Sequence, residues 1–287
     1  MYSPNDPVIK TNGDVFIQSY QGASLHIWAT GRVRISDDVW ITGADTINGL
    51  ADNVALSNGT SIAIDGRGEP TLDIRAGMTL AGLGTPTTIT DGGIFTAFVP
   101  ISPPTSADIE VGSILFANSA DFTDLLPGKV LLTNQYEPNA SLAGNITVTD
   151  TQGLGTIQIG GDIDTRSVTF DSKGEITLNG NINVSSPNGM GGEVTLLANS
   201  NIVGSSINTS GGINGSSGNI ALISQNGDIF LSNAFITSEN RGELKGGDID
   251  IRGRSLFVND GTQLSTINFG KGDAGNVTIE SFKQVTL

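Results

Sequence analysis

The stretch Gly246–Ser281, GGDIDIRGRSLFVNDGTQLSTINFGKGDAGNVTIES, begins and ends on nearly the same phrase. The segment Gly-Asp-Ile-Asp-Ile at 247–251 returns as Gly-Asn-Val-Thr-Ile at 275–279, a step of 275 − 247 = 28 residues. A phrase restated at a fixed interval of 20 to 50 residues is typical of repeat proteins, in which each unit stacks on the last. The sequence therefore predicts an architecture built from repeated units.

The phrase Gly-x-[Val/Ile]-x-apolar recurs along the chain. Its alternation of apolar and other residues predicts a short strand with two apolar side chains on one face and the intervening side chain on the other. We expect the leading glycine to supply a turn conformation that other residues avoid. Ten copies begin at Gly13, Gly31, Gly128, Gly144, Gly174, Gly192, Gly218, Gly227, Gly247 and Gly275.

Further short alternating runs, separated by Asn, Ser and Gly, lie between the copies. Three short strands in about 20 to 28 residues match one coil of a parallel β-helix, which is right-handed by the general crossover preference. At about 24 residues a coil and about 4.8 Å a step, the chain would make about a dozen coils and a rod of about 55 to 60 Å. Because they share one position in the phrase, these residues are predicted to form aligned interior columns: Ile146, Ile176, Val194, Ile220, Ile249 and Val277.

The chain is not uniform along its length. Six of its ten prolines lie between residues 86 and 138, and proline cannot join the interior of a strand ladder. We therefore divide the chain into less regular coils at 1–142, with a proline-rich irregular insertion at about 85–142, and regular repeats at 143–287. The fold class is all-β, and both parts are expected to belong to one continuous solenoid.

Composition limits the function. The 14 Lys and Arg against 29 Asp and Glu give a net charge of −15, which argues against binding to nucleic acid or to an anionic membrane. With no cysteine, disulfides and thiolate metal sites are excluded. The sequence contains no run of about 18 apolar residues that would span a membrane as a helix.

The repeats resemble those of a known family. GADTINGLADNVALSNGTSIAIDG at 43–66, TLDIRAGMTL at 71–80, GGDIDIRGRSLFVNDGTQLST at 246–266 and GDAGNVTIE at 272–280 are similar to the repeat regions of filamentous-haemagglutinin-like exoproteins of the cyanobacterial type. The resemblance implies a two-partner-secretion adhesin that is secreted or held at the cell surface. It also implies an outer-membrane transporter as partner of the full-length protein, and a segment here without the secretion module.

The expected function is a non-catalytic shaft or adhesion segment, with glycans or surface proteins as ligands and end-to-end self-association as a further property. A carbohydrate-active β-helix, a polysaccharide lyase or hydrolase, is the alternative. The candidate ligand-binding residues are Trp28 and Trp40, whose rings we expect on the outward face of their strands, and His26 beside them. His26 is the chain's only histidine and is expected to be an exposed strand residue.

No catalytic residue, cofactor or metal is predicted. The nearest approach to an enzyme-like set is His26 with Arg32, Arg34, Asp37 and Asp38, in which no nucleophile and base are positioned together by the sequence. Asp-x-Asp pairs at 162–164 and 248–250 each offer two carboxylates, fewer than the six to eight oxygens of a calcium site. They are interpreted as solvated surface charge.

Overall fold

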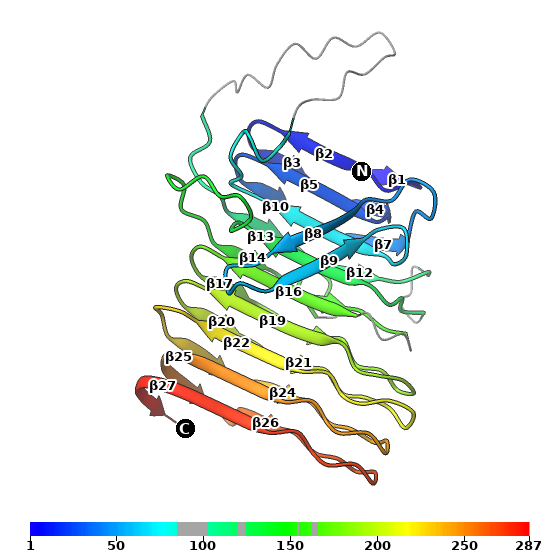
Figure 1. The fold of residues 1–287 in the computed structure, drawn as a ribbon, viewed down its shortest axis with the longest axis vertical. Coiled ribbons are helices and arrows are strands. Elements are labelled where there is room, and N and C mark those ends of the chain that lie inside the picture. Colours follow the sequence, from blue (N-terminus) through cyan, green and yellow to red (C-terminus); the bar gives the residue numbers. More distant parts are fainter. Residues whose placement is uncertain (85–102, 120–123, 154, 162–165, 287) are drawn as a thin grey trace.

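The computed structural model describes residues 1–84, 103–119, 124–153, 155–161 and 166–286. The described residues form 27 strands joined by turns, with 25 of them in long parallel sheets, so the chain is a parallel β-helix (Figure 1). No helix of the described residues is long and apolar enough to cross a membrane. The all-β solenoid predicted from the sequence is confirmed.

Each coil contributes a strand to each of three faces. Face A is the nine-stranded sheet of β1 (Tyr2–Ser3), β4 (Tyr20–Ala23), β7 (Val39–Gly43), β12 (Ile114–Phe116), β15 (Ile157–Gln158), β18 (Ile182–Asn183), β21 (Ile207–Asn208), β24 (Phe235–Thr237) and β26 (Gln263–Ser265). Face B contains β2 (Val8–Thr11), β5 (Leu25–Ala29), β10 (Thr71–Arg75), β13 (Lys129–Thr133), β16 (Ser167–Ser172), β19 (Glu193–Ala198), β22 (Ile220–Ser224) and the first half of β25 (Ile249–Asn259). Face C contains β3 (Val15–Ile17), β6 (Val33–Ile35), β11 (Ile109–Val111), β14 (Ile146–Val148), β17 (Ile176–Leu178), β20 (Ile202–Gly204), β23 (Ile229–Ser232) and the second half of β25.

Strand β25 joins two of these faces. Its first residues pair with β22 and its last residues pair with β23, so faces B and C become one 16-stranded sheet. Strand β27 (Val277–Thr286) pairs along most of its length with β25. A single long strand thus turns the corner that earlier coils cross with a break between two strands.

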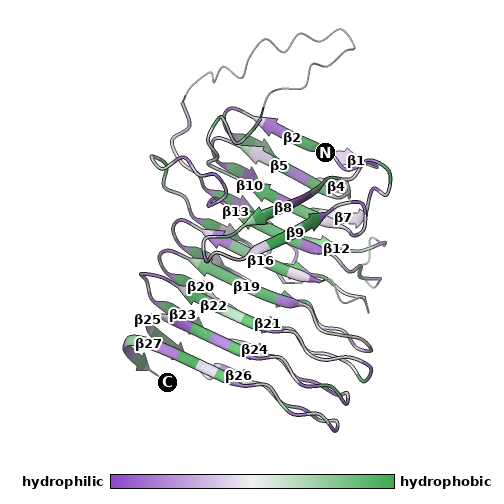
Figure 2. Ribbon diagram, in the orientation of Figure 1, coloured by the Kyte–Doolittle hydropathy of each residue, from purple (hydrophilic) through white to green (hydrophobic). Residues whose placement is uncertain are grey.

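The core consists of aliphatic columns, one for each face. On face B the register aligns Val130, Val168, Val194, Ile220, Ile249 and Val277. On face C it aligns Ile109, Ile146, Ile176, Ile202, Ile229 and Leu256. Figure 2 shows the resulting alternation of hydrophobic and hydrophilic segments along the strands.

The interior positions agree with the prediction except at one residue. Ile146, Ile176, Ile220 and Ile249 are fully buried and Val194 is 1% exposed, but Val277 is 42% exposed. Val277 lies on β27, whose sheet partner is β25 alone, so one side of this strand has no neighbouring coil.

The phrase occurs twice in each coil, once on face B and once on face C. Successive core residues on face B are separated by 220 − 194 = 26, 249 − 220 = 29 and 277 − 249 = 28 residues. Coils are therefore longer than the 24 residues expected, and face A has nine strands instead of about a dozen. Nine strands about 4.8 Å apart give a stack of about 40 Å, shorter than the expected rod.

The glycine of the phrase serves close approach between coils, so the expectation of a turn conformation is wrong. Of the ten phrase glycines, only Gly13 has a positive φ. A Cβ placed on Gly247 would lie 2.1 Å from the carbonyl oxygen of Gly218, and one on Gly218 would lie 2.0 Å from that of Gly192. Glycine stacks on glycine because any side chain would push the coils apart.

The residue after each glycine explains the preference for Asp and Asn. The side-chain oxygen of Asn219 accepts a hydrogen bond from the backbone N–H of Asp248 at 2.9 Å, and Asp248 accepts one from the N–H of Asn276 at 2.7 Å. Asn145 and Asn201 do the same for the next coil on face C. These residues therefore form polar ladders parallel to the axis that satisfy N–H groups at the strand starts.

The proline-rich zone contributes more regular structure than its composition suggests. Strands β11, β12 and β13 lie within it and join the three faces. Pro127 directly precedes β13 and so avoids the ladder interior. Residues 85–102 and 120–123 of the zone lie outside the described residues.

We expect Gly247→Ala to destabilise the fold by about 1 to 3 kcal/mol, because the added methyl group must displace the Gly218 carbonyl. Thermal unfolding measures the effect. Gly43→Ala is the matched control, since a Cβ there meets nothing within 4 Å. Equal melting temperatures for the two variants would contradict this role of the glycine.

Candidate functional site

One hairpin leaves the coil and lies across face B. Strands β8 (Ala51–Ala55) and β9 (Ser61–Asp65) pair antiparallel between β7 and β10, and Figure 1 shows them crossing in front of the coil strands. The tip contains Asn58 and Gly59, with Gly59 at a φ of +84° that favours glycine. Val54 and Ile64 of the hairpin pack on Leu131 of β13, which faces outward to meet them.

Polar contacts hold the hairpin at both ends. At its base, Asp52 accepts a hydrogen bond from Arg75 Nη1 at 2.7 Å. At its tip, the backbone N–H and hydroxyl of Ser57 donate to the two carboxylate oxygens of Asp171, at 2.8 and 2.5 Å. Burial raises the pKa of Asp171, and the bonds from Ser57 partly offset that rise.

A fully buried charge cluster lies under the base of the hairpin. His26 is hydrogen-bonded through Nδ1 to Asp73 and through Nε2 to Asp6, each at 3.1 Å, and none of the three side chains is exposed. Asp73 also accepts from Arg75 Nη2 at 2.8 Å. Asp6 accepts from the backbone N–H of Leu50, at the start of the hairpin, at 2.9 Å.

The cluster is stable because its charges alternate in sign. Burial by itself would lower the pKa of His26, but hydrogen bonds and charges from Asp6 and Asp73 raise it to about 9. Burial would likewise raise the pKa of Asp73, yet His26 and Arg75 hold it below its usual range. The cluster thus contains an imidazolium between two carboxylates at neutral pH.

The aromatic rings around Arg75 complete this base. The guanidinium lies 4.6 Å from the ring centroids of both Trp28 and Tyr136, and Lys10 Nζ lies 4.1 Å from that of Trp28. Trp28 Nε1 also donates to Asp73 at 3.2 Å. The Trp28 ring is half-buried and already engaged by two cations.

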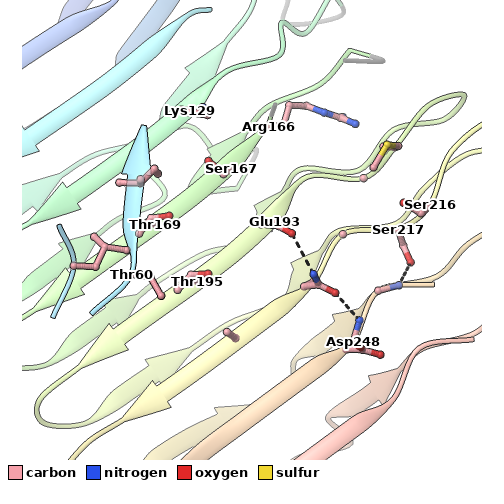
Figure 3. Close-up of a pocket in the computed structure, with 18 of the residues that line it drawn as sticks. Thr60, Lys129, Arg166, Ser167, Thr169, Glu193, Thr195, Ser216, Ser217 and Asp248 are labelled. Atoms are coloured by element: carbon pink, nitrogen blue, oxygen red, sulfur yellow. Dashed lines mark hydrogen bonds between the residues drawn. The ribbon is translucent and has the colours of Figure 1, made fainter. Parts of the chain in front are cut away.

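A polar groove runs from the hairpin along face B toward β25. Its volume is ≈ 920 Å³, and Figure 3 shows side chains from the hairpin, the coil strands and the turns before them around it. We call it the axial groove. Its upper wall is the hairpin segment 56–63 without Ser57 and Gly59, its floor is formed by β16, β19 and β22, and its side wall is formed by the turns at 190–191, 216–218 and 245–247.

The floor of the axial groove is shallow because its central column has small side chains. The register places Thr169, Thr195 and Ala221 side by side on successive strands. Among the described residues, the hydroxyls of Thr169 and Thr195 have no hydrogen-bond partner, and the same holds for the buried hydroxyl of Ser167. The groove therefore presents a line of hydroxyl groups at the spacing of neighbouring strands, about 4.8 Å.

The charges that line the groove are largely compensated. Lys129 lies 2.6 Å from Glu69, and Lys245 lies 3.0 Å from Asp248. Glu193 accepts a hydrogen bond from the Asn219 side chain at 3.1 Å as part of the face B ladder. The site is thus polar but close to neutral, although the whole chain carries −15.

The structure does not bring the three predicted ligand-binding residues together on one face. His26 is fully buried, so its expected exposure is wrong: a buried neighbour, Asp6, covers the face that alternation left open. Trp28 lies on face B, whereas Trp40 lies on face A and donates through Nε1 to the carbonyl of Ala117 at 2.8 Å. None of the three lines the axial groove.

The enzyme-like set is also dispersed over separate partners. Arg32 pairs with Asp14 at 3.0 Å and Arg34 with Glu110 at 3.3 Å. Asp37 accepts from Gln18, and Asp38 accepts from Thr151 and Gln152. His26 has no contact with any of these residues, because its ring nitrogens bind Asp6 and Asp73.

Metal binding finds no cluster among the described residues: no group of three or more His, Asp or Glu side chains is placed to hold an ion. Asp248 and Asp250 are paired with Lys245 and Arg252. The Asp162–Asp164 pair lies outside the described residues.

Sequence reasoning missed the hairpin and therefore the groove. The signal was present: Asn58-Gly59 lies between two alternating runs, which is a strong indication of a hairpin. The charge cluster had no comparable signal, since Asp6, His26 and Asp73 are 20 and 47 residues apart and meet only through the coil register.

His26 predicts a pH dependence of stability. Its pKa is about 9 in the folded chain and about 6.5 when unfolded, so its contribution is complete below pH 6.5 and is lost as pH rises through 9. The difference corresponds to about 3 kcal/mol. Unfolding in denaturant between pH 6 and 10 should show this decline.

Because His26 is the only histidine, its ring resonances in an NMR titration report this group alone. A titration midpoint near 9 is expected. A midpoint near 6.5, or stability that rises from pH 6.5 to 9, would contradict the charged cluster.

Comparison with known proteins gives no relative for this arrangement. No family model, no curated protein and no solved structure matches the chain. The function of the axial groove and of the solenoid is therefore inferred from the residues of this chain.

Proposed function

We propose that the chain is a non-catalytic shaft or adhesion segment of a large exported cell-surface protein. The observation that carries the proposal is the uninterrupted parallel stack, in which every coil rests on its neighbour through the same glycine and Asp or Asn positions. Such a stack is rigid along its axis and can be extended by repetition. A rod of this kind holds a binding surface at a distance from its anchor.

The placement of the charged residues also supports a structural role. Glu193 and Asp248, which line the groove, take part in the ladder that ties coil to coil. His26, the one imidazole of the chain, is buried between two carboxylates with no route to a substrate. These groups contribute to holding the fold and not to acid–base chemistry.

The similarity of the repeats to filamentous-haemagglutinin-like exoproteins adds the cellular setting. On this proposal the full-length protein leaves the cell through an outer-membrane transporter, and glycans or surface proteins are its ligands. End-to-end association of separate chains is part of the proposal, because the parallel strands at the two ends of the stack continue the same three faces.

A carbohydrate-active β-helix is the second candidate, and the axial groove is the observation that favours it. The groove contains cations and carboxylates, Lys129, Arg166, Glu193 and Asp248 among them. Incubation with acidic polysaccharides and calcium, followed by absorbance of unsaturated products, separates the two candidates. We expect no product, and steady product formation would replace the shaft by a lyase.

The cellular part of the proposal predicts surface exposure. Antibodies raised against the purified chain should label intact cells that express the full-length gene as strongly as permeabilised cells. A cytoplasmic marker protein, labelled only after permeabilisation, is the control. Labelling of this protein only after permeabilisation would overturn the assignment to the cell surface.

A further inference from the structure

We infer that the axial groove binds an uncharged linear oligosaccharide along the axis of the coil. The inference rests on the proposed adhesion function and names the ligand class of its binding surface. It assigns binding to face B below the hairpin, away from both tryptophans.

The first argument is the chemistry of the floor. The hydroxyls of Ser167, Thr169 and Thr195 are not used by other described residues, so a ligand can supply the missing partners. Ala221 continues the central column and leaves room for a sugar ring above it. A sequence of hydroxyls on successive strands is suited to a polymer that repeats its own hydroxyl groups.

The second argument is charge. Lys129 and Lys245 are neutralised by Glu69 and Asp248, and Glu193 is held by Asn219. A polyanion would find no free cationic row here, and the chain's net charge of −15 would repel it. The groove is therefore matched to a neutral ligand.

The third argument concerns shape. The groove is open and is closed at one end by the hairpin, whose residues Thr60 and Ser61 line it. The backbone groups of face B are already paired between coils, so a peptide could not add as a further strand on this face. An elongated ligand that is recognised by side-chain hydroxyls fits both facts.

The test is binding of cellohexaose, maltohexaose and mannohexaose, with hexagalacturonate as the charged comparison, measured by ligand-detected NMR and calorimetry. We expect at least one neutral hexasaccharide to bind and the charged one not to bind. Thr195→Trp places an indole on the groove floor and should weaken binding at least about tenfold.

Thr147→Trp is the matched control, because Thr147 occupies the same position of the phrase on face C and is likewise half-buried. It should leave the affinity unchanged, and circular dichroism confirms that both variants fold. Equal loss in both variants, or preference for hexagalacturonate, would overturn the inference.

No binding of any neutral probe at millimolar concentration would also overturn the inference. Surface labelling of intact cells would be unaffected by that result, so the proposed shaft function would stand alone. Cleavage of a bound probe would keep the groove as the sugar site and overturn its non-catalytic use.

Discussion

The distance between one coil and the next governs the rest of this structure. Parallel strands hydrogen-bond at about 4.8 Å, so every atom that lies between two coils must fit within that spacing. Glycine at the start of each phrase meets the condition, since a Cβ on Gly218, Gly247 or Gly275 would lie about 2 Å from a carbonyl oxygen of the coil before. Aliphatic columns inside and Asn–Asp ladders outside then follow from stacking equivalent positions directly above one another.

The same condition explains how much of the fold the sequence predicted. The period-2 alternation and the recurring glycine identify the strands, and all ten phrases are strands in the structure. Sequence alone did not show that copies at Gly218 and Gly227 belong to different faces of one coil, because corners leave no distinctive residue pattern. Coil number was overestimated for that reason.

The candidate site could be predicted less well than the fold. Alternation correctly placed His26 away from the aliphatic core, but it carried no information about the Asp6 loop that covers it. Residues such as Thr169 and Thr195 look ordinary in the sequence, and they become a floor only when the register sets them side by side. Pairings across 20 to 50 residues are decided by the length of each coil, which local patterns do not encode.

The hairpin has a mechanical consequence. Its contacts reach Asp6 before β2, His26 on β5 through that carboxylate, Arg75 on β10, Leu131 on β13 and Asp171 on β16. It therefore acts as a brace across successive rungs, in parallel with the ladder of backbone hydrogen bonds. Under a pulling force the coils from β19 onward are held by their own stacking alone, whereas those under the brace must break both connections before they peel away. The solenoid is thus stiffer toward its first coils, and strain along the axis concentrates below β16, where the axial groove lies.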